Sequence, residues 1–258
     1  MASLPLFALA DRLAQGETVL SAWCGIADPS IAGVLAQEPF DAVTLDMQHG
    51  PITLGEVIRA VALIGGAGKP AAARIAVGEF QNVSRLFDAG VSAVIAPMIN
   101  TMADARAFAA AAKYPPLGER SWGSYGGLGA SGLSANDYFR QANRFSMSFA
   151  MIETREAMAI LDDILALDGI DAVFVGPSDL SIGLSNGSKI DPTAPEVDDA
   201  IRHIVARASA VNKPVGIYAA SAERAKAFVE MGARFVTVMS DTAFLRTGAQ
   251  AALRHVRS

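Results

Sequence analysis

The feature that most constrains the fold is a pattern repeated along the whole chain: a short apolar run, a polar turn and a helical stretch. Runs that are apolar throughout and separated by helices indicate a parallel sheet covered by helices on its outer face. Eight runs are expected as strands: Val19–Ile26, Ala42–Gln48, Ala71–Val77, Ala93–Ile99, Ser146–Glu153, Ala172–Gly176, Val215–Ala219 and Phe235–Ser240.

Helical patterns follow the strands, and Thr154 and Ser221 are expected to cap two of the helices at their N-termini. The expected helices include Asp28–Gln37, Thr53–Gly65, Thr101–Ala112, Thr154–Leu167, Glu196–Val211 and Ser221–Met231. Eight strand–helix units in 258 residues predict an α/β protein, a (β/α)8 TIM barrel forming a single domain over residues 1–258, since this fold takes about 250 residues. A doubly wound open sheet is the alternative, but it would need fewer strands. Residues 1–16 are expected to form a short amphipathic helix that covers one end of the barrel.

Composition narrows the class of protein. The net charge of −5 argues against nucleic acid or an anionic membrane as a partner, and no apolar run approaches the ~18 residues of a membrane span. Cys24 is the single cysteine, so an intrachain disulfide is impossible and nothing indicates an oxidising compartment. We expect a cytoplasmic enzyme that acts on small molecules.

One segment breaks the strand–helix pattern. Residues Gly118–Gly132 form a glycine-rich connection before the fifth strand. A loop of this length is expected to be a lid, an interface arm or a disordered excursion.

Chemistry in such a barrel sits where the strands end, at the C-terminal face. Two carboxylates, Glu153 and Asp179, follow adjacent strands. Two oxygen ligands with no cysteine nearby favour Mg²⁺ or Mn²⁺ over zinc, so the sequence predicts a metal site there. The alternative is that Glu153 caps its helix and Asp179 caps a turn.

Other polar residues fall at the same face. Arg74 is expected either to neutralise Asp46 or Glu153, or to stabilise an oxyanion beside the metal. His49 follows Asp46 by three residues, a spacing that suits a positioned base. The turn Gly176–Pro177–Ser178 offers backbone N–H groups for a substrate carboxylate, although a proline-containing turn without this role fits the residues equally well.

Two absences restrict the chemistry further. A Schiff-base aldolase needs a lysine at a strand end, and none of the five lysines is so placed: Lys69, Lys113, Lys189, Lys213 and Lys226. The last two strands also lack the glycines that would hold a phosphate. A phosphosugar substrate is therefore disfavoured.

The chain resembles the metal-dependent (class II) pyruvate aldolases of the 4-hydroxy-2-oxoheptanedioate and 2-dehydro-3-deoxyglucarate aldolase family. The resemblance covers nearly the whole chain and rests, with Arg74, on Leu45–Pro51, Asp88–Ala105, Lys113–Gly123, Met151–Ala157 and Gly169–Ser181. It implies an aldehyde-lyase that forms a pyruvate-type enolate from a 2-oxo acid, such as pyruvate or hydroxypyruvate, and adds it reversibly to an aldehyde. The reverse reaction cleaves 4-hydroxy-2-oxo acids.

The resemblance also implies roles for the residues at the mouth. Glu153 and Asp179 would bind the divalent metal ion, Mg²⁺ or Mn²⁺ with Co²⁺ as a further candidate. Gly176 and Ser178 would hold the substrate carboxylate, and Arg74 would stabilise the enolate oxygen.

For the rest of the active site, the resemblance implies that Asp46 orients His49 to move the proton, while Trp23 lines the pocket. It further implies a homo-hexamer, a trimer of dimers that exchange the last helix. Asp88 and Arg120 would then lie at an interface near a neighbouring active site and its acceptor.

Two substrate-binding positions depart from the family pattern. Gln48 stands where many relatives have glutamate, and Met151 stands where many have glutamine. Methionine cannot make the hydrogen bonds of that amide, which alters the contacts available to the keto oxygen.

The acceptor and two rival functions stay open on the sequence. No cation lies between Arg120 and Arg140 to pair with a distal carboxylate, so a small or hydroxylated aldehyde is expected. One rival is a lyase of citramalyl- or malyl-type coenzyme A thioesters, although no basic cluster suits the nucleotide. The other is a non-catalytic carboxylate-binding barrel.

Overall fold

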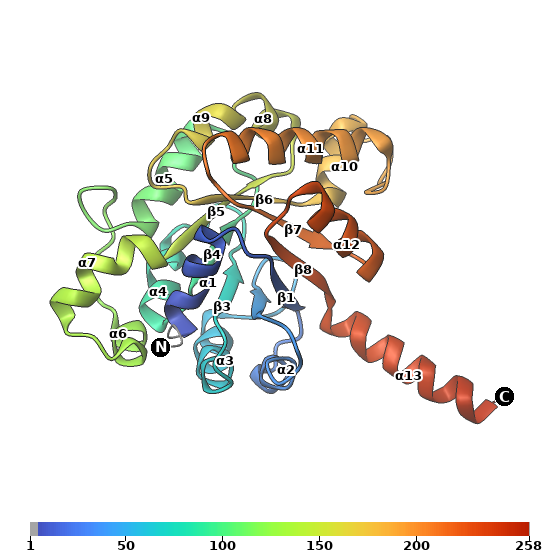
Figure 1. Ribbon diagram of the computed structural model, residues 1–258, viewed down its shortest axis with the longest axis horizontal. Helices are drawn as coiled ribbons and strands as arrows, with labels where there is room; N and C mark the ends of the chain where they lie inside the picture. The colour runs from blue at the N-terminus through green and yellow to red at the C-terminus, as the bar shows by residue number, and fades with distance from the viewer. Residues whose placement is uncertain (1–4, 258) are drawn as a thin grey trace.

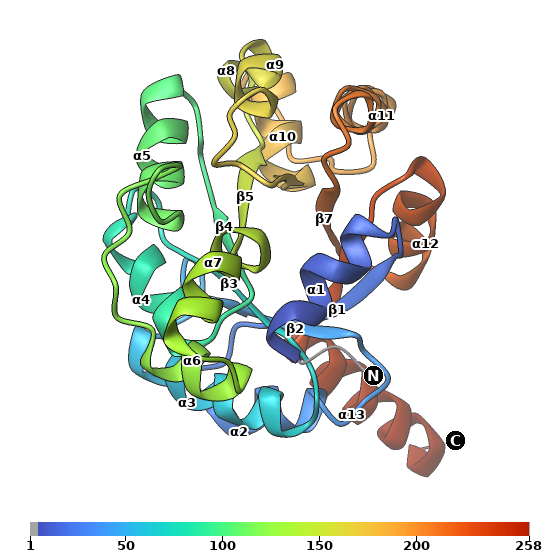
Figure 2. The ribbon, with the colours of Figure 1, turned by 60° about the vertical axis from the view of Figure 1, so that its left-hand side comes forward.

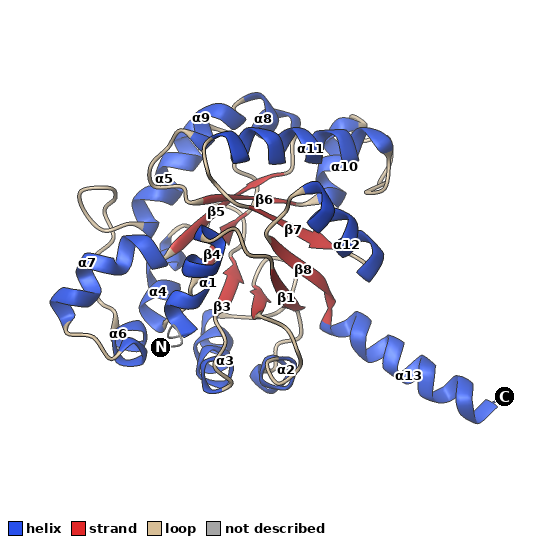
Figure 3. Ribbon diagram, viewed as in Figure 1, coloured by secondary structure: helices blue, strands red, loops and turns tan. Residues whose placement is uncertain are grey.

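All eight expected strands form, and each pairs in parallel with the next one along the chain. In the computed structural model, which describes residues 5–257, the last strand pairs with the first and closes the barrel (Figure 3). The strands are β1 (Val19–Cys24), β2 (Ala42–Asp46), β3 (Ala71–Arg74), β4 (Ala93–Ala96), β5 (Met147–Ile152), β6 (Ala172–Val175), β7 (Val215–Ala219) and β8 (Phe235–Ser240). The predicted (β/α)8 barrel is confirmed, and several strands end earlier than predicted because the chain leaves the sheet there to form the mouth.

The helices surround this barrel (Figure 1). They are α1 (Pro5–Ala14), α2 (Pro29–Leu35), α3 (Leu54–Gly66), α4 (Gln81–Ala89), α5 (Met102–Ala112), α6 (Tyr125–Ser131), α7 (Ala135–Phe145), α8 (Arg155–Ala159), α9 (Leu161–Leu165), α10 (Pro177–Leu184), α11 (Pro195–Ala210), α12 (Ala222–Met231) and α13 (Asp241–Arg257). The predicted caps are confirmed, since Thr154 accepts from the N–H of Ala157 and Ser221 from that of Arg224. The single helix predicted over Thr154–Leu167 is wrong: it is two helices that meet at Ile160, where φ is −112° and ψ is 17°.

The interior of the barrel is filled by large side chains from alternate strand positions. Phe149 and Phe174 lie within 5.4 and 6.4 Å of Phe235, measured between ring centroids. Gly216 makes room for them, because a Cβ there would lie 2.5 Å from the Phe174 ring. A second apolar layer packs between the sheet and the helices. The closed barrel therefore places its chemistry at the ends of the strands and not along its axis.

The N-terminal end of the barrel, which we call the base, is covered by α1 and α6. Apolar residues of α1 join the same buried cluster as the inward residues of the strands, as predicted for this helix; residues 1–4 lie outside the described part of the chain. Helix α6 packs on the end of α4, where Gly126 lies against the backbone of Ala89. The glycine-rich segment Gly118–Gly132 thus contains a helix at the base. The expectation of a disordered excursion or of a lid over its own mouth is wrong, and an interface arm remains a prediction.

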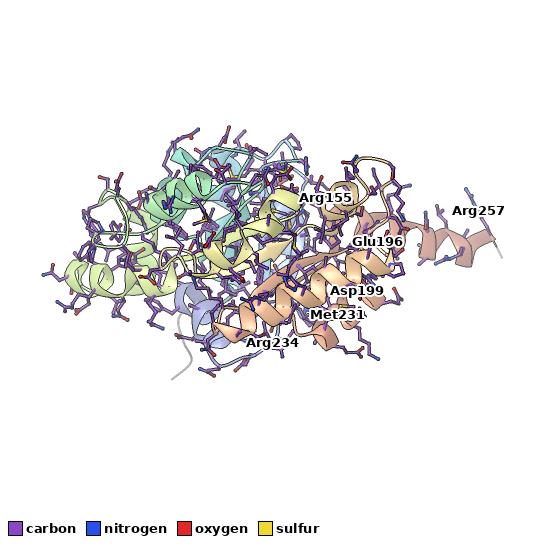
Figure 4. All side chains as sticks on the ribbon, turned by 90° about the horizontal axis from the view of Figure 1, so that it is seen from above. Arg155, Glu196, Asp199, Met231, Arg234 and Arg257 are labelled. Atoms are coloured by element: carbon purple, nitrogen blue, oxygen red, sulfur yellow. The ribbon has the colours of Figure 1, made fainter. Side chains whose placement is uncertain are left out.

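Helix α13 follows β8 and extends away from the barrel in both ribbon views (Figures 1 and 2). Arg257, near its end, lies well outside the rest of the molecule (Figure 4). Three apolar side chains of this helix, Leu245, Leu253 and Val256, are exposed. The exchange of this helix between subunits stays a prediction. Within residues 5–257, no helix combines the length and the apolar character needed to cross a membrane.

Candidate active site

A cavity of about 460 Å³ opens at the C-terminal mouth of the barrel. A concave site with a few convergent polar groups on an apolar lining is typical of a small-molecule site. It is lined by Trp23, Gly25, Asp46, His49, Gly50, Pro51, Arg74, Met151, Phe174, Gly176, Pro177, Ser178, Asp179, Tyr218, Ser240, Asp241 and Thr242. Most of the residues predicted for the site are therefore brought together here.

The register of the sheet places Asp46 beside Arg74 at the ends of β2 and β3. The guanidinium donates from Nε to Asp46 Oδ1 at 2.9 Å and from Nη2 to Oδ2 at 2.6 Å. Trp23 Nε1 donates to the same carboxylate at 3.3 Å, and the Trp23 ring lies 4.8 Å below the guanidinium carbon. The predicted pairing of Arg74 with Asp46 is present, and this pair is buried. Nη1 of Arg74 takes no part in it, so this nitrogen can donate to a substrate oxygen.

His49 is exposed and lines the cavity. Asp46 Oδ1 accepts from the backbone N–H of Gln48 at 3.0 Å and from that of His49 at 3.5 Å. Asp46 therefore fixes the turn that carries His49. Within the described chain, no hydrogen bond joins Asp46 to the imidazole itself.

Glu153 continues the inward-facing positions of β5 and is 2% exposed. Its Oε1 accepts from the backbone N–H of Met98 at 2.8 Å, and Met98 has a left-handed φ of 53°. The pKa of Glu153 is raised to about 7, chiefly by burial and further by the negative charge of Asp179. The hydrogen bond from Met98 and the positive charge of Arg74 lower this pKa and offset part of the rise. Asp179, in the first turn of α10, is thus close enough to act on Glu153.

These two carboxylates fit a divalent ion. Glu153 is buried, and it forms no ion pair within the described residues, a state that costs free energy unless a cation or a proton is bound. Its Oε2 occupies the space beside Gly176, where a Cβ would lie only 2.4 Å away. Among residues 5–257 no group of three or more His, Cys, Asp or Glu is arranged to hold a metal. A hard cation held by two protein carboxylates leaves its other positions to water and substrate, as Mg²⁺ commonly does.

The turn Gly176–Pro177–Ser178 starts α10 at the edge of the cavity, with Gly176 as the N-cap residue and Pro177 in the first turn. The first N–H groups of a helix have no acceptor within the helix. Those of Ser178 and Asp179 are therefore suited to a carboxylate, and Pro177, which has no N–H, shapes the turn.

Of the two positions that depart from the family pattern, Met151 lines the cavity and Gln48 does not. Met151 is buried and lines the cavity next to Phe174. Gln48 does not line it, and Gln48 Oε1 is buried without a hydrogen-bond partner in the described structure. A role for Gln48 in substrate binding stays a prediction.

Asp88 and Arg120 lie at the base and not at the mouth. Arg120 Nη2 donates to Asp88 Oδ1 at 2.7 Å, and its guanidinium carbon lies 4.4 Å from the Tyr114 ring centre. A part for these residues in an active site would need a second subunit, and it remains a prediction.

Several lining residues were missed on the sequence. Tyr218, Ser240 and Thr242 follow the rule used for the other strands, since they lie at the ends of β7 and β8 or directly after them. Asp241 is buried, and its Oδ2 accepts from the N–H groups of Gly25 and Ile26 at 2.8 Å each. It ties the loop after β1 to the start of α13. Asp241 directly follows the last strand, and this position could have identified it from the sequence.

A closed (β/α)8 barrel with a carboxylate-rich mouth defines an enzyme of the TIM-barrel class. The chain matches the family described as HpcH/HpaI aldolase/citrate lyase over residues 20–247, and it belongs to this family. Aldol cleavage and citrate cleavage both break a carbon–carbon bond, so the protein is a carbon–carbon lyase.

Individual relatives agree with this assignment. The chain is 38% identical to a hydroxypyruvate/pyruvate aldolase of Rhizorhabdus wittichii, over 95% of this chain and 96% of that protein. It is 35% identical to a 4-hydroxy-2-oxo-heptane-1,7-dioate aldolase of Salmonella dublin, over 95% of this chain and 92% of that one. A crystal structure of an HpcH/HpaI aldolase from Desulfitobacterium hafniense matches with a TM-score of 0.88 and 26% identity, covering 97% and 96% of the two chains.

Proposed function

We propose that the protein is a class II aldolase that uses a divalent metal ion to form an enolate from pyruvate or hydroxypyruvate. It adds the enolate reversibly to a small or hydroxylated aldehyde, and in reverse it cleaves 4-hydroxy-2-oxo acids. The observation that carries the proposal is the buried Glu153 beside Asp179, with the Arg74–Asp46 pair at the same mouth. The relatives named as aldolases support it.

Glu153 and Asp179 would hold the metal ion, Mg²⁺ or Mn²⁺ with Co²⁺ as a further candidate. When bound there, the ion supplies electron withdrawal at the keto group of the 2-oxo acid. The N–H groups at the start of α10 orient the substrate carboxylate. Nη1 of Arg74 donates to the keto oxygen as negative charge develops on it.

The proton leaves C3 of the 2-oxo acid, next to the keto carbon. The imidazole of His49 lines the cavity and is exposed, and it is the base that would accept this proton. Trp23, Met151 and Phe174 surround the reacting carbon with apolar surface, which excludes water and strengthens the electrostatic contacts.

We also infer a cytoplasmic homo-hexamer, a trimer of dimers that exchange α13. The extended position of α13 and its exposed Leu245, Leu253 and Val256 support an intersubunit contact. The location in the cytoplasm is supported by the single, buried and unpaired Cys24.

Exchange of the methyl protons of pyruvate in D₂O, followed by NMR without any aldehyde, tests the proposal. We expect exchange in the metal-loaded enzyme, and loss of exchange after chelation and in Glu153→Gln. Glu156→Gln is the matched control, because Glu156 is exposed in the first turn of α8. Full exchange in the chelated enzyme would remove the metal from the mechanism. No exchange in the loaded enzyme would favour a carboxylate-binding barrel without catalysis.

A further inference from the structure

Three hydroxyl groups line one wall of the cavity and have no part in forming the enolate. Tyr218 lies on β7, Ser240 ends β8, and Thr242 lies in the first turn of α13. Ser240 Oγ and Thr242 Oγ1 are 3.0 Å apart, and the Tyr218 side chain lines the same cavity. We call these three residues the hydroxyl wall.

Tyr218 of the hydroxyl wall packs against Trp23. The Tyr218 ring meets the Trp23 ring edge-on, with centroids 5.4 Å apart and an interplanar angle of 71°. Trp23 in turn donates to Asp46. Tyr218 is therefore connected through Trp23 to the Arg74–Asp46 pair. The hydroxyl wall lies on β7, the end of β8 and the start of α13, while Glu153 follows β5. The second reactant, which bonds to C3 of the 2-oxo acid, can extend toward this side of the mouth.

A small recess continues behind Tyr218. It measures about 50 Å³ and shares Pro177, Ser178 and Tyr218 with the main cavity. One water-sized group fills about 30 Å³, so the recess suits a terminal group such as a hydroxymethyl. Arg224 borders it, but Asp198 already pairs with that guanidinium at 2.5 and 3.3 Å.

The charges that line the cavity disfavour an acceptor aldehyde with a carboxylate. Among the described residues that line the main cavity, Arg74 is the only lysine or arginine, and Asp46 holds it. The buried carboxylate of Asp241 lies next to the hydroxyl wall in the sequence and in the lining. A distal carboxylate on the substrate would therefore find no free cation to pair with among the described residues that line this cavity.

We propose that Tyr218, Ser240 and Thr242 form a specificity-determining subsite that binds the hydroxyl groups of the acceptor aldehyde. The subsite selects neutral, polyhydroxylated aldehydes over aliphatic and carboxylate-bearing ones. Each of these hydroxyl groups can both donate to and accept from a substrate hydroxyl. An acceptor without hydroxyls displaces water from these groups and leaves them without a hydrogen-bond partner. The enzyme then binds the transition state of that acceptor less tightly. This inference rests on the proposed aldolase function.

The test compares two acceptors of equal carbon number, glyceraldehyde and propanal, with pyruvate as the donor. We expect the ratio of their kcat/KM values to fall about 3- to 10-fold in Tyr218→Phe and again in Ser240→Ala, the size expected for one neutral hydrogen bond. Tyr125→Phe is the matched control, since it removes the same atom from a side chain at the base that is 64% exposed. Its ratio should equal that of the wild type.

Two results would overturn the subsite: an unchanged ratio in both variants, or a higher kcat/KM for succinic semialdehyde than for glyceraldehyde in the wild type. Proton exchange in pyruvate alone separates this failure from failure of the aldolase function. Exchange with an unchanged ratio removes only the subsite. Absence of exchange in the metal-loaded wild type removes both.

Discussion

The two ends of the barrel each hold a buried arginine paired with an aspartate. At the mouth, Arg74 pairs with Asp46 and lies over Trp23. At the base, Arg120 pairs with Asp88 and lies over Tyr114. The two pairs have similar chemistry, yet of these two pairs only the one at the mouth lines the candidate site, where the charge of Arg74 also acts on Glu153.

Their surroundings explain the difference. The side chain of Arg120 is 0% exposed, and Nη1 and Nη2 contact Ser146 and Ser124 in addition to Asp88. Arg74 donates to Asp46 from two nitrogens and keeps the third for a ligand. A buried ion pair therefore indicates a functional site only where part of it faces a cavity that a substrate can enter.

The first prediction concerns the base. Arg120→Ala should lower the free energy of unfolding by about 3–5 kcal/mol, because it leaves Asp88 unpaired among buried groups. Urea denaturation measures this loss. Proton exchange in pyruvate, normalised to the folded fraction, should stay within about twofold of the wild type, since the donor site is built from residues at the other end. A comparable loss of exchange would mean that the base contributes to donor chemistry.

The second prediction concerns the mouth. Arg74→Lys keeps the charge but loses the two-pronged pairing with Asp46 and the third nitrogen, Nη1, that this pairing leaves over. We expect proton exchange to fall about 100- to 1000-fold, the usual cost of one oxyanion donor. The matched change Arg120→Lys should leave exchange near the wild-type rate. Equal rates in the two lysine variants would erase the distinction between the two arginines.

The barrel and the groups at its mouth could be predicted from the sequence. The groups at the mouth stand out because a polar side chain at the end of an apolar strand costs free energy unless it is paired or binds a ligand. That rule identified Asp46, Arg74 and Glu153. It did not reveal the Arg120–Asp88 pair, because Asp88 lies in α4 and Arg120 in the loop after α5, so that neither follows a strand. Nor did it reveal the hydrogen bond that Glu153 accepts from the backbone N–H of Met98, because every residue type except proline carries such a donor.

The third prediction concerns the pH dependence of stability that Glu153 gives to the mouth. The aspartate described at the base, Asp88, is paired with Arg120, whereas Glu153 has no such partner among the described residues. The Glu153 pKa of about 7 lies above the ordinary 4.5, so the folded state keeps a proton that the unfolded state loses. Stability of the chelated protein is therefore highest below pH 4.5 for this group and falls as the pH rises through 7. The loss is about 3 kcal/mol at 1.36 kcal/mol per pKa unit.

Urea denaturation in the presence of a chelator, at pH 5 and pH 8, measures this loss. Glu153→Gln should remove most of the difference between the two pH values, whereas the exposed control Glu156→Gln should keep it. Saturating Mn²⁺ should restore stability at pH 8, because the metal ion then compensates the buried charge. A pH dependence that persists in Glu153→Gln would show that another group causes it.

The smallest expected effect tests whether the mouth is shaped around Glu153. A Cβ at Gly176 would lie 2.4 Å from Glu153 Oε2, so Gly176→Ala must displace the carboxylate. We expect Mn²⁺ affinity, measured by calorimetry, to fall about 10- to 100-fold, as for other residues that position a metal ligand. Gly183→Ala is the matched control in the same helix, because its nearest neighbour, the Cα of Thr154, would lie at an ordinary 3.5 Å. If both variants bind Mn²⁺ as the wild type does, the side chain of Glu153 is not a ligand, and the mouth would hold its arginine pair for structure alone, as the base does.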